Sequence, residues 1–327
     1  MTLKFMDVYF SRAYASCYSE VEKAEVCEYR HYSALGEVFY VFLKRKIDSD
    51  RLDGYYDIIT PYGYGGPVIC KTPSESTEEL VRTFSDEFTQ YCTENNIVSE
   101  FVRFHPLANN HIYFKEHYSP EFNRKTVCVN LTEKDAMSTV TARCRRASRD
   151  AVKKGVEIIF DFSGKYLDDF HRIYLQTMDK NHASQYYHFD KQFFKGMCSK
   201  LRDQVFFVHA LFDNKVVASV MFLCFYDYIH YHLLGTDPEF YHLNANTLIL
   251  TSVIQWGIEQ GKIAIHLGGG YTNAEDDSLL VFKKSFTKEE LYDFYIGKKI
   301  YNQEIYDKLC EEKNIDKTSA FFPLYLS

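Results

Sequence analysis

Hydrophobic and polar residues alternate with two different periods along the first third of the chain, and these periods predict its elements. Runs rich in aromatic and β-branched residues are typical of strands, and they occupy Glu37–Lys46, Tyr55–Thr60 and Ile97–Phe104. Before the last run, apolar residues recur every three or four positions, which predicts a helix from about Ser76 to Asn95. Ser76 followed three residues later by Glu79 predicts a capping box at its start.

A second stretch of the chain repeats this order of elements. The turn pair Asp213–Asn214 predicts a hairpin, and Gly261 stands where a helix commonly ends. The predicted helix of this stretch runs from Asn244 to Glu259. The predicted strands are Gln204–Phe212, Lys215–Phe225, Tyr228–Leu234 and Ile263–Leu267. Strand, strand, loop, helix and strand therefore occur twice, which predicts two related mixed α/β domains, residues 1–135 and 136–327.

The junction between the two domains is expected near Asn130–Thr139, and further elements follow it. Gly155 is expected to end the first of the helices that come after the junction. The other predicted elements are helices at Thr141–Lys154, Lys165–Lys180, Asp190–Leu201 and Gln303–Glu312, and strands at Val156–Phe160 and Leu291–Ile296.

Composition narrows the class of protein. With 327 residues, 46% hydrophobic and 25% charged, the chain is predicted to be globular, and its 17% aromatic residues suit sheets. No apolar run is long enough to span a membrane, and Met1–Glu20 lacks the pattern of a secretory signal, so a cytoplasmic location is expected. Nine scattered cysteines indicate reduced thiols, and no Cys/His spacing predicts a metal. The net charge of −7 argues against DNA or bulk nucleic acid as a partner.

One segment departs from this acidic balance. Six basic residues lie within Arg143–Lys154, and Arg146, Arg149 and Lys153 share one face of the predicted helix. Arginine binds phosphate through two parallel hydrogen bonds, so this face is a candidate site for a phosphate-bearing substrate. The candidate substrates of this kind are a diphosphate-containing nucleotide sugar, a lipid-linked carrier and tRNA. A solvated face with ion pairs is the simpler interpretation.

Several ordered stretches resemble the FemAB/FemX family of non-ribosomal peptidyltransferases. The matching stretches are YYDIITPYGYGGP (Tyr55–Pro67), FVRFHPL (Phe101–Leu107), the basic helix ending in KKGV (Lys153–Val156), FHRIYLQTMDKN (Phe170–Asn181), ANTLILTSVIQWGIEQG (Ala245–Gly261) and HLGGGYTNAEDDSLLVFKKSF (His266–Phe286). The resemblance implies an α/β fold with mixed sheets, made of tandem GNAT-like acyltransferase domains. It implies transfer of an amino acid from aminoacyl-tRNA to a cell-wall precursor, with the donor as co-substrate and no further cofactor.

Two features depart from the patterns of this family and of its fold. GNAT enzymes that use acyl-CoA hold the pyrophosphate with a glycine-containing loop at a helix N-terminus. The corresponding stretch here, Asp237–Asn246, contains no glycine, which argues against ordinary acetyl-CoA binding. The long helical arm of some family members has no room in this chain.

The resemblance also implies catalytic residues. Phe282 and Lys283 match a Phe-Lys pair of the family, and Lys283 is predicted to stabilise phosphate or the oxyanion, with Lys284 as the alternative. A solvated lysine beside a strand is the simpler interpretation. Tyr271 follows a glycine run at a strand end, where α/β proteins often bind ligands. The acidic residues Glu275–Asp277 are either a proton acceptor or a solvated turn.

Further candidates bind substrate. Tyr62 and Tyr64 lie in a loop that otherwise consists of glycine and proline, which is either a binding loop or a tight turn. Arg103 matches an arginine of the family, and it is either an anchor for a phosphate or carboxylate of the substrate or part of a salt bridge at the edge of the core. His105 is expected to be structural. Tyr231 is a candidate site hydroxyl.

The sequence therefore predicts an acyltransferase that moves an aminoacyl group onto an amine of an envelope precursor such as a peptidoglycan muropeptide. The first alternative is an acyl-CoA-dependent N-acyltransferase acting on an amino sugar of a surface polysaccharide. The second is a non-catalytic protein that binds the precursor on the same fold. Peripheral contact with a lipid-linked substrate is compatible with each of these three functions.

Overall fold

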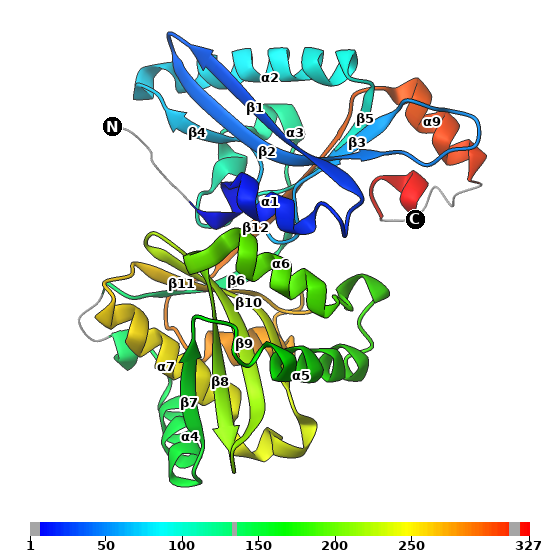
Figure 1. Cartoon of the computed structure of the whole chain (residues 1–327). Helices are drawn as coiled ribbons and strands as arrows, with labels where there is room; N and C mark the ends of the chain where they lie inside the picture. Colours follow the sequence, from blue (N-terminus) through cyan, green and yellow to red (C-terminus); the bar gives the residue numbers. More distant parts are fainter. Residues whose placement is uncertain (1–6, 133–135, 314–320) are drawn as a thin grey trace. The chain divides into compact units, whose positions relative to one another are not determined.

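The structure is a computed structural model that describes residues 7–132, 136–313 and 321–327. The chain forms two compact units, of which the first consists of Met1–Asn123 and Asp293–Ser327 and the second of Arg124–Tyr292 (Figure 1). The predicted domain boundary after residue 135 falls at residues 133–135, outside the described part, and stays a prediction. Across the described residues, no helix combines the length and the apolar character needed to cross a membrane.

The first unit is built on a mixed sheet with the strand order β1-β2-β3-β5-β12, and β4 pairs with β2. Its strands are β1 Ala24–Ser33, β2 Gly36–Lys46, β3 Tyr56–Ile59, β4 Val68–Lys71, β5 Ile97–Arg103 and β12 Tyr292–Ile300, whose first residue belongs to the second unit. Its helices are α1 Arg12–Tyr18, α2 Thr77–Glu94, α3 Lys115–Tyr118 and α9 Gln303–Glu312.

Helix α2 connects the parallel pair of this sheet, β3 and β5. Its residues Leu80, Phe84 and Phe88 are fully buried, as their spacing predicts, and they pack against aromatic residues of β2. The predicted capping box is wrong: the side chain of Ser76 makes no cap hydrogen bond. The reason is local, because Ser76 ends the 3-10 turn Ser74–Ser76 with φ −105° and ψ 3°, whereas a capping residue is extended.

The second unit has the strand order β6-β11-β10-β9-β8-β7. Its strands are β6 Glu121–Asn130, which begins in the first unit, β7 Glu157–Asp161, β8 Val205–Phe212, β9 Lys215–Phe225, β10 Tyr228–Thr236 and β11 Ala264–Gly269. Its helices are α4 Ala142–Lys153, α5 Leu167–Lys180, α6 Lys191–Leu201, α7 Ala245–Glu259 and α8 Ser278–Lys284.

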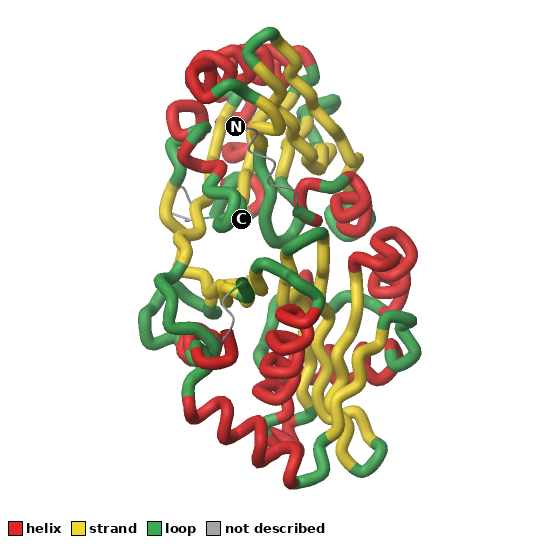
Figure 2. Tube along the Cα trace, turned by 90° about the vertical axis from the view of Figure 1, so that its left-hand side faces the viewer, coloured by secondary structure: helices red, strands yellow, loops and turns green. Residues whose placement is uncertain are grey.

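Helices cover both faces of this sheet (Figures 1 and 2). Neighbouring residues of β8 show it: the ring of Phe206 contacts Trp256 of α7, and the ring of Phe207 contacts Phe170 of α5. Successive side chains of a strand point to opposite faces, so α7 and α5 lie on opposite sides. Helix α4 packs on α7 through the hydrogen-bonded hydroxyls of Ser148 and Thr251, 2.7 Å apart.

The predicted repeat is present in both units. Each unit contains a parallel pair of strands joined by a helix: β3 and β5 through α2, and β10 and β11 through α7. Asp213 and Asn214 both have positive φ, as the predicted hairpin turn requires, and Gly261 has φ +65° after α7. The predicted α/β fold with mixed sheets is therefore confirmed.

Candidate functional site

A turn between β11 and α8 forms the centre of the candidate site in the second unit. Asp277 caps α8: its Oδ1 accepts hydrogen bonds from the amides of Leu279 and Leu280, and its Oδ2 accepts one from the amide of Thr272. A Cβ atom on Gly270 would lie 2.3 Å from Asp277 Oδ1, so only glycine allows this approach. The three acidic residues of this segment therefore differ in their surroundings: Asp277 is buried and structural, whereas Glu275 and Asp276 are exposed.

Lys283 lies on α8 and points into this site rather than into solvent. Its side chain is only 6% exposed, and its Nζ donates a hydrogen bond of 2.6 Å to the carbonyl of Gly269. Burial lowers the pKa of Lys283 to about 7; the nearby Arg124 guanidinium also lowers it, and Asp277 opposes the shift. The alternative of a solvated lysine beside a strand is wrong, because the residue is helical and buried.

Arg124 holds the same turn from β6. Its Nη1 donates hydrogen bonds to the carbonyls of Gly270, at 2.8 Å, and Tyr271, at 3.2 Å. Three consecutive carbonyls, from Gly269 to Tyr271, therefore accept hydrogen bonds from two cationic side chains. The sequence by itself does not indicate Arg124, since no local pattern connects it with a turn 146 residues away.

Two tyrosines predicted for the site lie in this unit. The ring of Tyr231 is buried, with its centroid 5.6 Å from Lys283 Nζ. Tyr271 is 60% exposed, and its hydroxyl accepts a hydrogen bond of 3.3 Å from Asn181 Nδ2. Burial raises the pKa of both hydroxyls, so both stay protonated near neutral pH and are able to donate hydrogen bonds.

The neighbours of Lys283 differ from it in their surroundings. The Phe282 ring contacts the Phe286 ring edge to face, with centroids 5.2 Å apart, and packs against the core. Lys284 is exposed. Of the three candidates in this segment, Lys283 is therefore the one whose polar atom lies in the site.

The loop before α7, Asp237–Asn246, is ordered by side-chain contacts instead of glycines. Asp237 Oδ1 accepts a hydrogen bond from the amide of Glu239, and Oδ2 lies 3.3 Å from Lys215 Nζ. Residues Pro238–Leu243 form a 3-10 helix, and Asn244 has φ +55°. A backbone already fixed in this way differs from a glycine loop that wraps a pyrophosphate.

Three predicted substrate contacts lie in the first unit. Arg103 makes two hydrogen bonds to Thr60. Its Nη1 donates to the Thr60 carbonyl at 3.1 Å, and its backbone amide donates to the Thr60 hydroxyl. The backbone carbonyl of Tyr62 accepts a hydrogen bond from the Tyr14 hydroxyl. Both Tyr62 and Tyr64 are half-buried, and Gly63 between them has φ +94°. The loop is thus a packed turn, and its predicted role in binding stays a prediction.

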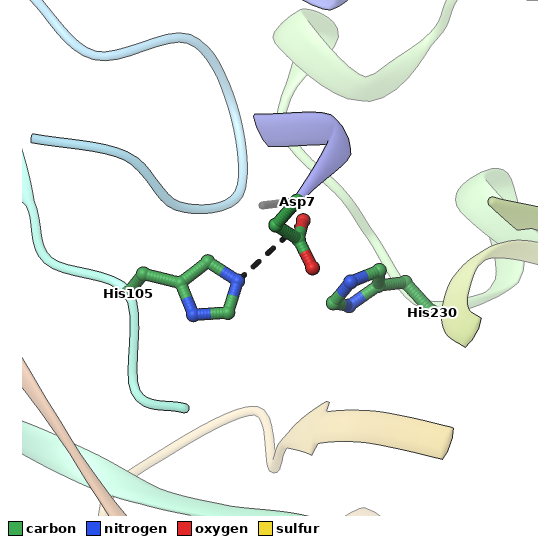
Figure 3. Close-up of side chains that lie close together, drawn as sticks. All are labelled: Asp7, His105 and His230. Atoms are coloured by element: carbon green, nitrogen blue, oxygen red, sulfur yellow. Dashed lines mark ion pairs between the residues drawn. The ribbon is translucent and has the colours of Figure 1, made fainter. Parts of the chain in front are cut away.

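His105 has the structural surroundings expected of it. It is fully buried, and its Nδ1 accepts hydrogen bonds from the amides of Leu107 and Ala108. Its Nε2 lies 3.6 Å from Oδ1 of Asp7, the contact marked by the dashed line in Figure 3. His230, also labelled there, belongs to the second unit, where its ring lies 5.7 Å from that of His266.

The basic helix is α4, and its cations have two kinds of surroundings. Arg145 donates hydrogen bonds to the carbonyls of Val140 and Met137, and Lys154 donates one to the carbonyl of His242. The side chains of Arg146, Arg149 and Lys153 are exposed.

Sequence comparisons connect this geometry with known proteins. Residues 138–277 match the model of the acetyltransferase (GNAT) domain. A stretch of 179 residues is 28% identical to the UDP-N-acetylmuramoylpentapeptide-lysine N(6)-alanyltransferase of Weissella viridescens. That stretch is 54% of this chain but spans only half the length of that relative.

Solved structures share the fold. The structure of FemX has a TM-score of 0.69 at 12% identity, with 92% of this chain and 94% of that chain covered. The C-terminal domain of a putative lysylphosphatidylglycerol synthetase from Agrobacterium fabrum has a TM-score of 0.56 at 12% identity, covering 92% and 89%. A tandem GNAT protein of the clavulanic acid pathway has a TM-score of 0.50 at 7% identity, covering 84% and 83%.

Residues 138–277 therefore match a GNAT domain, and the chain shares the α/β fold of FemX. Among proteins with this fold, the comparisons confirm the resemblance to the FemAB/FemX-like family.

Proposed function

We propose that this protein transfers an aminoacyl group from aminoacyl-tRNA to an amine of a peptidoglycan precursor. The observation that carries the proposal is Lys283, a buried cation held against the glycine turn of a GNAT-type unit. Similarity to an alanyltransferase that acts on a muramoylpentapeptide supports the choice of substrates. We further propose a cytoplasmic location, no cofactor beyond the donor, and peripheral contact with any lipid-linked form of the acceptor.

The proposed reaction needs no enzyme nucleophile. The acceptor nitrogen attacks the ester carbonyl carbon of the donor, and a tetrahedral oxyanion forms. The carbon–oxygen ester bond then breaks, and the proton lost by the amine ends on the leaving ribose hydroxyl. The charge that develops is negative, so a protonated Lys283 beside the carbonyl oxygen stabilises the transition state more than the substrate.

A donor and acceptor matrix tests the proposal. Charged tRNA or acyl-CoA is mixed with a nucleotide-linked muropeptide or an amino sugar, and products are identified by mass spectrometry. We expect product from the tRNA and muropeptide pair, and a loss of about 100-fold or more in kcat for Lys283→Met. Lys284→Met is the matched control, because this neighbouring lysine is exposed. No product from any pair overturns the proposal.

The pH dependence tests the role of Lys283. Because the pKa of Lys283 is lowered to about 7, its cationic fraction falls as the pH rises through that value. We therefore expect kcat to decline above about pH 7 in the native enzyme and to decline less in Lys283→Arg, whose guanidinium stays charged. A decline of the same size in Lys283→Arg contradicts the role of Lys283 as the cation.

The acyl-CoA alternative has one observation in its favour, the match of residues 138–277 to an acetyltransferase domain. Turnover of acetyl-CoA without tRNA in the same matrix would replace our proposal with it. A non-catalytic binding protein predicts a third result, which is precursor binding without product and no effect of Lys283→Met.

A further inference from the structure

Four cations form a stripe along the solvent face of α4, and we call Arg143, Arg146, Arg149 and Lys153 the α4 stripe. At 100° per residue, the four positions fall within an arc of about 120°. All four side chains are exposed. The stripe is about 15 Å long, since ten residues separate its ends at about 1.5 Å of rise each.

The stripe is available for a ligand. Among the residues that the structure describes, the side chains of Arg143, Arg149 and Lys153 have no hydrogen-bond or ion-pair partner. Arg146 has a long and exposed pair with Asp150, at 3.8 Å, which contributes little in water. The other cations of the helix, Arg145 and Lys154, are instead bonded to backbone carbonyls.

The stripe begins at the helix that carries Lys283. The amide of Thr141, which caps α4, donates a hydrogen bond of 2.9 Å to the carbonyl of Ser285. Cys144 Sγ lies 2.9 Å from Ser285 Oγ, and Ser285 follows Lys283 by two residues. The N-terminus of α4 is therefore fixed to the C-terminus of α8, and the stripe leads away from it.

This geometry distinguishes the possible ligands. A diphosphate is much shorter than the stripe and occupies only one or two of its cations. A membrane-bound helix needs an apolar face to insert, but the apolar face of α4, with Cys144, Ser148 and Ala151, is buried against the unit. A narrow row of cations on a helix fixed to the end of α8, the helix that carries Lys283, fits an extended chain of phosphodiesters.

We propose that the α4 stripe binds the sugar–phosphate backbone of the RNA whose aminoacylated end reaches Lys283. This inference rests on the proposed function, because it assigns the donor to a surface of the same unit. Backbone contacts of this kind carry no sequence information, so the stripe binds acceptor stems of different sequence alike.

The test uses the full chain and a short RNA hairpin with a single-stranded CCA end, with binding followed by fluorescence anisotropy over a range of salt. We expect the triple variant Arg146→Glu, Arg149→Glu, Lys153→Glu to bind at least tenfold more weakly. Its slope of log affinity against log salt should fall by about 2–3, because three phosphate contacts are lost and each contributes about 0.7–0.9. The matched control is Lys165→Glu, Lys195→Glu, Lys200→Glu, with the same charge change at exposed positions of the same unit.

Equal affinity of the two triple variants overturns the inference. So does selective loss of binding to phosphatidylglycerol vesicles with RNA binding intact, since this makes the stripe a membrane surface. If the triple variant does not fold, Arg149→Gln alone should lower the salt slope by about one unit. Failure of the proposed function looks different: RNA binds through the stripe, but no aminoacyl group reaches any acceptor.

Discussion

Glu100 of β5 shows how burial and hydrogen bonding compete at a single residue. It is fully buried, and its carboxylate accepts hydrogen bonds from the hydroxyls of Tyr40, at 2.7 Å, Tyr118, at 3.0 Å, and Tyr301, at 2.5 Å. The three hydroxyls stabilise the charged form, yet burial outweighs them and raises the pKa of Glu100 to about 7. The same cause acts with opposite sign on Lys283, because burial disfavours the charged form of either group.

We expect Glu100 to make the protein less stable as the pH rises. Its pKa in the folded state lies above its ordinary value of 4.5, so ionisation costs nothing below pH 4.5 and opposes folding increasingly up to about pH 7. The cost is on the order of 3 kcal/mol at full ionisation. Urea unfolding at pH 5 and pH 8 measures it.

The variant Glu100→Gln should reduce the difference in unfolding free energy between these two pH values. Glu94→Gln is the matched control, because Glu94 is exposed. An unchanged difference in Glu100→Gln would show that the carboxyl ionises in the folded protein as readily as in the unfolded chain.

At the scale of elements, two helices of the second unit each contain a glycine, and the space around these two glycines differs. A Cβ atom on Gly196 of α6 would have no heavy atom within 4 Å apart from its chain neighbours and the backbone of its own helix. A Cβ atom on Gly257 of α7 would lie 2.7 Å from Leu131 Cδ1 and 3.1 Å from Ile229 Cδ1. The first glycine only weakens its helix, whereas the second makes room for the core.

Alanine should therefore act in opposite directions at the two positions. Gly196→Ala is expected to stabilise by up to about 1 kcal/mol, because alanine loses less entropy in a helix. Gly257→Ala is expected to destabilise by about 1–3 kcal/mol, because the core must shift. Urea midpoints of both variants measure this, and a shift of both in the same direction contradicts the packing described for α7.

At the scale of the whole molecule, the two units differ in how the chain builds them. The second unit is continuous, whereas the first needs residues from both ends of the chain. Strand β12 supplies the antiparallel neighbour of β5, with Ile296 opposite Arg103. Ile305, Leu309 and Tyr325 pack in one buried cluster with Val98 of β5.

Fragments should show this difference. Residues 124–292 alone are expected to unfold cooperatively, as followed by circular dichroism. Residues 1–123 alone are expected to aggregate, because β5 loses its neighbour and becomes an exposed apolar edge. Joining residues 1–123 to 293–327 through a flexible linker should restore a cooperative transition, and cooperative unfolding of residues 1–123 by themselves would contradict the assignment.

The sequence by itself determined the long elements and their order, because periodicity is local. The helix predicted over Gln303–Glu312 is confirmed at both ends, and α2 and α7 differ by one residue at most. The sequence did not indicate β1, an edge strand in which charged and exposed residues interrupt the apolar ones, so that no apolar run forms. It also missed α8, which has only seven residues and is fixed by the cap of Asp277.

The tertiary structure decided the environment of the candidate site. The sequence indicated Lys283, but its burial, which lowers its pKa, follows from packing beside Gly269 and Tyr231 of two different strands. Arg124, on a third strand, lowers the pKa of Lys283 further through its charge. Likewise, the sequence placed six cations on one helix, and packing against α7 and α8 decided which of them face water. Desolvation and long-range hydrogen bonds depend on which segments meet in space, and no local period encodes that meeting.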